Sequence, residues 1–177
     1  MNNKRLNTRK LAACAMLIAL SAAGSLIGVP GTSIAFDSLP AFLGALALGA
    51  PAGMLVGFAG HWLTAYIHGF PYTVPVHAII SVFMAVTMLA FYAADRLLKR
   101  LGANVVLRGV CACAAGVIFN APLELLAVSP ILGLAVCLGL MLPLSAVALA
   151  NAAGGYIIFA ILVKTKVLGV FGASNEL

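Results

Sequence analysis

The sequence predicts an all-α integral membrane protein, a compact bundle of six transmembrane helices with both termini in the cytoplasm. Hydrophobic residues make up 64% of the chain and charged residues only 8%, whereas soluble domains average about 45–50% and about 25%. No Lys, Arg, Asp or Glu occurs between Asp37 and Asp95, or between Glu124 and Lys164. Because a crossing needs about 20 apolar residues, these stretches hold several crossings. Lipid cannot satisfy backbone polar groups, and the alternation of barrel strands is missing, so helices are expected.

Turn-forming residues separate three predicted helices in the first half of the chain. Pro30 and Gly31 follow the first helix, which is preceded by a basic cytoplasmic head. Gly49 ends the second helix, and Pro51 suits the first turn of the third, where a backbone donor is not needed. The head and these helices are expected to cover about 1–10, 11–29, 38–48 and 51–66.

Three further helices are expected in the second half, within a single domain over residues 1–177. Two prolines and a glycine between His68 and Pro75 predict a loop before the fourth helix, and a polar stretch from Asp95 follows it. The segment 131–142, after a Ser-Pro pair, is compatible with a loop, an interfacial segment or a re-entrant turn. The helices and the cytoplasmic tail are expected to cover about 75–94, 105–128, 143–163 and 165–177.

The basic residues predict the orientation, because cytoplasmic loops carry an excess of Lys and Arg. With six helices, all ten basic residues fall on one side, whereas a seventh crossing over 131–142 would move two of them to the other side. The net charge of +6 therefore indicates topology and contact with anionic lipid, not nucleic-acid binding. The ten residues are Lys4, Arg5, Arg9, Lys10, Arg96, Lys99, Arg100, Arg108, Lys164 and Lys166.

A few polar side chains fall within the predicted crossings, where such groups are costly and often functional. At 1.5 Å per residue, they lie in the outer half of the membrane or near its midplane, and the inner half is predicted to be apolar or small. This pattern predicts a binding pocket that opens outward over a closed floor. The candidate binding residues are Asp37, His61, His77, Asn120, Glu124 and Asn151.

Most of these residues have a structural alternative. Asp37 is placed to cap the second helix, His61 to bond a carbonyl, and Asn151 to bond a neighbouring helix, while ligand contacts fit as well. Glu124 is the strongest candidate because a buried acid needs a partner, a proton or a polar substrate.

The helix around Glu124 is expected to be irregular. Asn120 and Glu124 are one turn apart and therefore share a face. Pro122 lies between them, removes a backbone donor and disturbs the carbonyl of Ile118. A helix broken beside a cavity exposes backbone groups for binding.

Small residues at four-residue spacing predict close helix contacts. Gly53, Gly57 and Gly60 form such a strip in the third helix. Ala15 and Ala19 form another in the cytoplasmic half of the first helix, on which a partner helix can pack.

With these features, the chain resembles the substrate-specific S components of energy-coupling factor (ECF) vitamin transporters. The similarity rests on a mass of 18.1 kDa, on six predicted helices, and on the Ala15–Ala19 pair, which matches the A-x-x-x-A motif of helix 1 in that family. The run from Ile34 to Gly53 is also similar to the helix 2 to helix 3 region of several members.

The resemblance implies capture of a vitamin or precursor at the outer face of a prokaryotic cell membrane, by a multi-pass protein. It implies docking through Ala15 and Ala19 onto a membrane coupling subunit driven by two cytoplasmic ATPases. The chain lacks the phosphate loop G-x-x-x-x-G-K-[ST], so the energy is expected from these partners. No cofactor and no bound metal are expected, and the scattered histidines do not favour metal uptake.

The helix 2 to helix 3 run and Asn120-Ala-Pro122 look most similar to transporters for alpha-ribazole, a cobalamin precursor. Riboflavin and pantothenate are the next candidates.

Two other classes of function stay open at the level of sequence. A membrane-embedded enzyme would use Glu124 with His61 or His77 as an acid–base or metal site, although no H-x-x-x-H or H-E-x-x-H spacing occurs. A structural subunit of a membrane complex would use its polar residues for packing alone. Ligand binding by the isolated protein separates both from capture.

Overall fold

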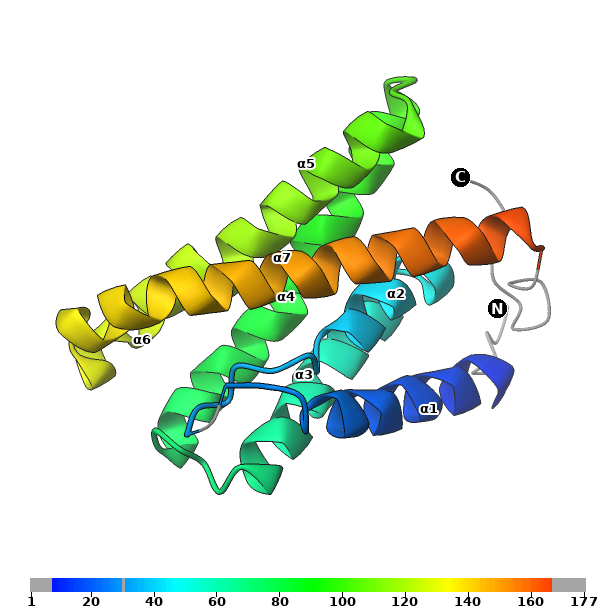
Figure 1. Ribbon diagram of the computed structural model, residues 1–177. Helices are drawn as coiled ribbons and strands as arrows, with labels where there is room; N and C mark the ends of the chain where they lie inside the picture. The colour runs from blue at the N-terminus through cyan, green and yellow to red at the C-terminus, as the bar shows by residue number, and fades with distance from the viewer. Residues whose placement is uncertain (1–7, 30, 167–177) are drawn as a thin grey trace, which may run out of the picture.

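A computed structural model describes residues 8–29 and 31–166, and these residues form a bundle of helices (Figure 1). Since α5, η1 and α6 follow one another without a break, the described chain contains six helical rods, as the sequence predicts. The elements are α1 (Thr8–Gly24), α2 (Leu39–Leu48), α3 (Ala50–Ile67), α4 (Val74–Arg100), α5 (Val105–Ile118), η1 (Phe119–Leu123), α6 (Glu124–Leu132) and α7 (Leu134–Lys164). Most of the predicted head (1–10) and tail (165–177) lies outside the described residues.

The short helix α2 is the most enclosed element of the bundle. It packs against α1, α3, α4 and α7, and its Phe42 ring meets the Phe91 ring of α4 edge to face, with centroids 4.8 Å apart. Gly49 has a φ of 102°, which glycine adopts without strain, and it turns the chain directly into α3. Ten residues of helix extend only about 15 Å, half of the hydrocarbon core of a bilayer, so α2 alone is too short to cross.

Glycines in α3 allow three neighbouring helices to approach closely. A Cβ atom on Gly53 would collide with Ala45 of α2, and one on Gly60 would lie 2.9 Å from the Ser21 side chain of α1. A Cβ atom on Gly57 would lie 3.2 Å from the Met84 carbonyl oxygen of α4. The predicted packing role of this glycine strip is confirmed.

Three rods are long and apolar enough to cross a membrane: Val74–Arg100, Val105–Leu132 and Leu134–Lys164. The helices α1 and α3 contain 17 and 18 residues and are near the lower limit for a crossing. Within the described residues, length and composition therefore support three crossings, and the total of six stays a prediction.

Several predicted helix boundaries were wrong. The first helix ends at Gly24, because the chain beyond it folds back through a bridge between Gly28 and Ala35. The fourth continues to Arg100. The last helix begins at Leu134 and not near Pro143, so most of the uncertain 131–142 segment is its first part. Pro143 lacks a backbone N–H donor, but the helix continues through it, with apolar residues on both sides.

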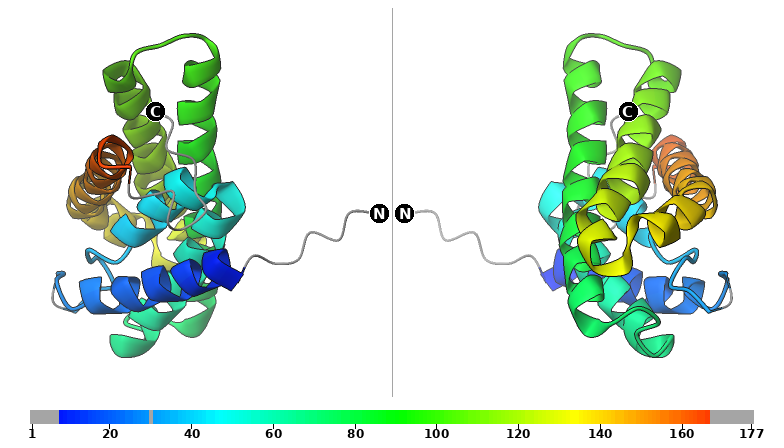
Figure 2. Two further views of the ribbon diagram at one scale, coloured as in Figure 1. Left: turned by 90° about the vertical axis from the view of Figure 1, so that its right-hand side faces the viewer. Right: turned by 90° about the vertical axis from the view of Figure 1, so that its left-hand side faces the viewer.

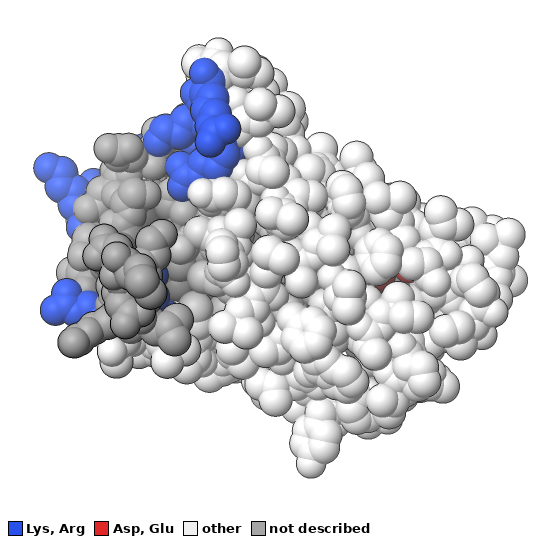
Figure 3. Space-filling model, turned by 180° about the vertical axis from the view of Figure 1, so that it is seen from behind, with Lys and Arg blue, Asp and Glu red and all other residues white. Residues whose placement is uncertain are grey.

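The ends of the bundle differ in charge. Figure 2 shows α4 and α5 side by side and antiparallel, joined by a short turn. The start of α1 and the end of α7 lie on the same side of the molecule in Figure 1. Seen from behind, Lys and Arg gather at one end and the remaining surface is almost uncharged (Figure 3).

Candidate functional site

A cavity lies between the 25–38 loop, α3, α4, the η1–α6 segment and α7. Five of the six predicted binding residues line it, although they come from distant parts of the chain: Asp37, His61, Asn120, Glu124 and Asn151. His77 contacts His61 but is not part of the lining. The grouping expected from the sequence is thus found for all of these residues except His77.

The cavity has a polar wall and an apolar wall. The apolar wall includes Leu125 and Val128 of α6 and Leu140 and Leu144 of α7. The cavity volume is about 40 Å³, which is room for a few water molecules and much less than the roughly 300–1,000 Å³ of ligand pockets. An organic ligand therefore requires the covering segments to move apart.

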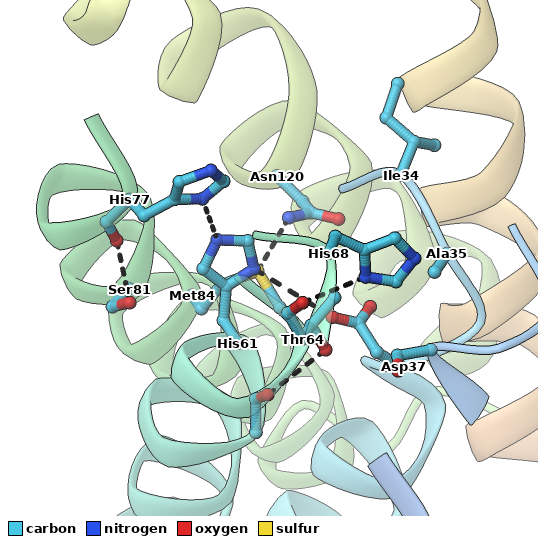
Figure 4. Close-up of polar contacts among 12 residues, drawn as sticks. Ile34, Ala35, Asp37, His61, Thr64, His68, His77, Ser81, Met84 and Asn120 are labelled. Atoms are coloured by element: carbon cyan, nitrogen blue, oxygen red, sulfur yellow. Dashed lines mark hydrogen bonds and ion pairs between the residues drawn. The ribbon is translucent and has the colours of Figure 1, made fainter. Parts of the chain in front are cut away.

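Asp37, His61 and His77 form a chain of close contacts in the polar wall (Figure 4). Asp37 Oδ2 lies 3.9 Å from His61 Nδ1, and His61 Nε2 lies 3.1 Å from His77 Nδ1. The second distance is a hydrogen bond, so one ring donates and the other accepts, and both rings cannot be doubly protonated together.

Asp37 does not cap α2, the structural alternative that the sequence offered for it. Ser38 occupies the N-cap position of α2. Asp37 is only 6% exposed, and its Oδ2 atom has no hydrogen-bond partner among the described residues. A buried acceptor without a partner is uncommon in folded proteins, and here it borders a cavity.

His77 lies behind His61 and supports it. Its ring lies next to the rings of Phe70 and Tyr72, and its carbonyl accepts a hydrogen bond of 2.8 Å from the Ser81 hydroxyl. The expected role of His77 as a direct ligand contact is not supported by this position. Tyr72 itself lines the cavity, and it was missed because it falls in a predicted loop.

The π-helical segment η1 positions Asn120 and Glu124. Pro122 lies inside it, and a π-turn suits this residue because a proline cannot donate to the carbonyl four residues earlier. The predicted irregularity is confirmed. Asn120 Nδ2 donates to Met84 Sδ at 2.9 Å and to Glu124 Oε2 at 3.3 Å, so both side chains point to the same region, as their spacing predicts.

Asn151 connects α7 to the loop that covers the cavity. Its Nδ2 atom donates to the Ala35 carbonyl at 3.0 Å, while its Oδ1 atom has no hydrogen-bond partner among the described residues. The loop is held internally by hydrogen bonds from Val29 N to Ile34 O and from Phe36 N to Ile27 O. Asn151 thus bonds to the loop and not to a neighbouring helix, and its Oδ1 atom borders the cavity.

A second buried polar group lies toward the basic end, where the sequence predicted only apolar or small residues. Arg108 donates to Asp95 through Nε and Nη2, at 2.8 to 3.0 Å, and the Tyr156 hydroxyl donates to Asp95 Oδ1 at 3.0 Å. The prediction for this half was wrong because Asp95 was assigned to the polar turn and Arg108, at the start of the predicted fifth helix, was counted only as a cytoplasmic charge. The sequence did contain a signal for this ion pair, because an acid and an arginine stand on either side of one short turn.

The described helices include three rods long and apolar enough to cross a membrane, and the bundle encloses a cavity that polar side chains line, features that fit a membrane protein with an internal binding site. The family model for the substrate-specific component of ECF transporters matches residues 9–173, and the chain belongs to this family. It is therefore a substrate-binding subunit of a membrane transporter and not an enzyme. Comparisons with curated proteins and with solved structures gave no match.

Family membership excludes the alternatives left open by the sequence. The acid–base role considered for Glu124 with His61 or His77 is wrong, as is a purely structural role for the chain. Within the described residues, no three His, Cys, Asp or Glu side chains are grouped as metal ligands would be.

Proposed function

We propose that this chain captures a vitamin or vitamin precursor at the outer face of a prokaryotic cell membrane, in the cavity bordered by Asp37, Glu124 and Asn151. The observation that carries the proposal is a pair of buried acceptors, Asp37 Oδ2 and Asn151 Oδ1, that border the cavity without a hydrogen-bond partner among the described residues. Such atoms are costly when left unpaired, and a bound ligand can satisfy them.

The proposed orientation has six crossings and both termini in the cytoplasm. It is supported by the gathering of Lys and Arg at one end (Figure 3), which the positive-inside rule assigns to the cytoplasm. Along α4, the cavity residues Ile80 and Met84 lie near the start, and Lys99 and Arg100 lie at the end. The cavity is therefore on the outer side in this orientation.

We propose that α1 docks onto a membrane coupling subunit, which two cytoplasmic ATPases drive. Ala15 and Ala19 are both exposed on α1, while Cys14 and Ser21 of the same helix are buried. The small side chains are thus directed away from the bundle, where a partner helix can approach closely.

The lead cargo is alpha-ribazole, followed by riboflavin and pantothenate. The motif that carries the similarity, Asn120-Ala-Pro122, contributes to the cavity through Asn120 and to the π-segment through Pro122. The run from Ile34 contributes Ile34, Ala35 and Asp37 to the same cavity. Entry of this cargo requires the cavity-lining residues between Ser33 and Ser38 to move outward, and the Asn151–Ala35 hydrogen bond is one contact that this movement breaks.

The test is a ligand screen on the purified isolated chain. A panel of vitamins and precursors is measured by thermal shift, and native mass spectrometry identifies any molecule that co-purifies. A ligand at 100 times its Kd should stabilise the fold by about 2.7 kcal/mol. If no small molecule is bound or stabilises the chain under any condition, the capture proposal fails.

A further inference from the structure

The cavity is lined by acidic side chains and, among the described residues, by no Lys or Arg. The two carboxylic acids in its lining are Asp37 and Glu124. Both acids are at least nine-tenths buried. Arg108, the buried arginine of the bundle, is committed to Asp95 at the other end. A carboxylate or phosphate on the ligand would meet two carboxylic acids in a desolvated space, with no Lys or Arg of the described lining to pair with it.

His61 does not supply the missing cationic partner for an anionic ligand. It is the lining residue that could become cationic, but its Nε2 atom is engaged with His77. Its Nδ1 atom faces Asp37 Oδ2 at 3.9 Å. A protonated His61 ring would therefore pair with Asp37 and would not be free to pair with an anionic ligand.

The unpaired atoms of the polar wall are acceptors. Asp37 Oδ2 and Asn151 Oδ1 are oxygens with no partner among the described residues, and the Asn151 amide is oriented by its donation to the Ala35 carbonyl. A carboxylate oxygen and an amide oxygen are satisfied only by donors. The opposite wall, with Leu125, Val128 and Leu144, favours an apolar ring.

We infer that the cargo is an uncharged or cationic ring compound that offers N–H or O–H donors and carries no carboxylate or phosphate. This inference rests on the proposed capture function and narrows it. It favours alpha-ribazole, an uncharged nucleoside, and riboflavin, an uncharged flavin, and it excludes pantothenate, a carboxylate.

The experiment uses pairs of ligands that are nearly equal in shape and differ in charge. Suitable pairs are alpha-ribazole and its 5′-phosphate, pyridoxine and 4-pyridoxic acid, and pantothenol and pantothenate. Affinities are measured by calorimetry on the full chain in nanodiscs. In every pair that binds, the uncharged member is expected to bind roughly tenfold tighter or more. Equal or tighter binding of the anion overturns the inference while the capture function stands.

Two variants, Asp37→Asn and Glu124→Gln, test whether the cavity acids cause the preference for uncharged ligands. The control is Glu176→Gln, which makes the same change in charge near the end of the chain. Each variant is scored by the ratio of the two affinities within one pair, because this ratio does not depend on the folded fraction. The ratio should fall at least about threefold in one or both cavity variants and stay unchanged in the control. An unchanged ratio in both cavity variants overturns the inference. Binding of no member of these pairs and of no vitamin in the wider screen overturns the capture function with it.

Discussion

At the scale of single residues, the cavity is lined by two buried acids, Asp37 and Glu124, and burial in an apolar surrounding is costly for such groups. Glu124 is 3% exposed, and its Oε2 atom accepts a hydrogen bond of 3.3 Å from the Asn120 amide. A buried carboxyl without a cation is costly unless it keeps a proton or meets donors. Under the proposed function, binding of a donor-rich molecule would offset that cost.

Replacing Glu124 by alanine is expected to weaken ligand binding about tenfold or more, because an acceptor for the cargo is removed. The measurement is the Kd of the best ligand from the vitamin screen. Ser129→Ala is the control, since the Ser129 hydroxyl donates to the Leu126 carbonyl on the same helix and does not line the cavity. Unchanged affinity in Glu124→Ala would place the binding site elsewhere.

At the scale of elements, the π-segment decides where Asn120 and Glu124 point. A π-turn inserts one residue into the α-helical pattern, and one residue corresponds to about 100° of rotation around the helix. Pro122 therefore fixes the direction of the α6 side chains relative to those of α5. The π-segment thus sets the direction of the side chains, and Asn120 and Glu124 are the polar groups that it directs toward the cavity.

Pro122→Ala should allow the α5–α6 rod to become a regular α-helix. Ligand affinity is expected to fall because Glu124 and the α6 residues after it rotate relative to α5 and so change their direction toward the cavity. The thermal midpoint stays the same or rises, since proline disfavours a helix interior. Calorimetry and thermal unfolding on the same sample separate the two effects. Wild-type affinity in a folded variant would contradict a positioning role for the π-segment.

The second element-scale feature is the joint of α4, α5 and α7 at the basic end. Asp95 is fully buried and Arg108 is 3% exposed, and Tyr156 adds a hydrogen bond from α7. Because the groups satisfy one another, the joint is expected to hold three long helices together and to take no part in binding.

Arg108→Ala leaves Asp95 as an uncompensated buried charge and is expected to destabilise the fold by about 3–5 kcal/mol. The change is measured as the free energy of unfolding in denaturant. Arg100→Ala, at the exposed end of α4, is the control and should cost less than about 1 kcal/mol. A second substitution, Asp95→Ala, should recover part of the loss in Arg108→Ala, and a fully additive pair would contradict the coupling.

At the scale of the whole molecule, the two proposed surfaces lie apart. The cavity is enclosed by α3, α4, α6, α7 and the 25–38 loop, whereas the alanine strip lies on the exposed side of α1. Capture and docking should therefore be separable by mutation.

Ala19→Trp is expected to abolish vitamin uptake by the assembled transporter and to leave ligand binding by the isolated chain within about twofold of wild type, because a bulky side chain blocks close helix approach. Uptake into cells and calorimetry on the purified chain provide the two readouts. Val110→Trp, at an exposed position of α5, is the control and should leave uptake intact. Lost binding in Ala19→Trp would show that the strip faces the bundle.

Much of the fold and the cavity could be predicted because lipid makes polar residues conspicuous. Asp37, Asn120 and Glu124 stand out in apolar runs, and helix spacing alone puts the last two on one face. The sequence could not reveal that His77 lies behind His61, since this depends on how α3 and α4 are rotated against each other. It also could not place the start of α7. A proline is typical of the first turn of a helix, but Pro143 is the tenth residue of α7.

The most direct test of cargo binding in the cavity compares two leucine-to-tryptophan changes on α7. Leu144 lines the cavity, and Leu149 is 51% exposed on the outer surface of the same helix. Leu144→Trp should fill the binding space and reduce the affinity for the cargo by a hundredfold or more, roughly 2.7 kcal/mol, while Leu149→Trp should bind as wild type. Intact binding in a folded Leu144→Trp protein, or loss confined to Leu149→Trp, would contradict a binding site in this cavity.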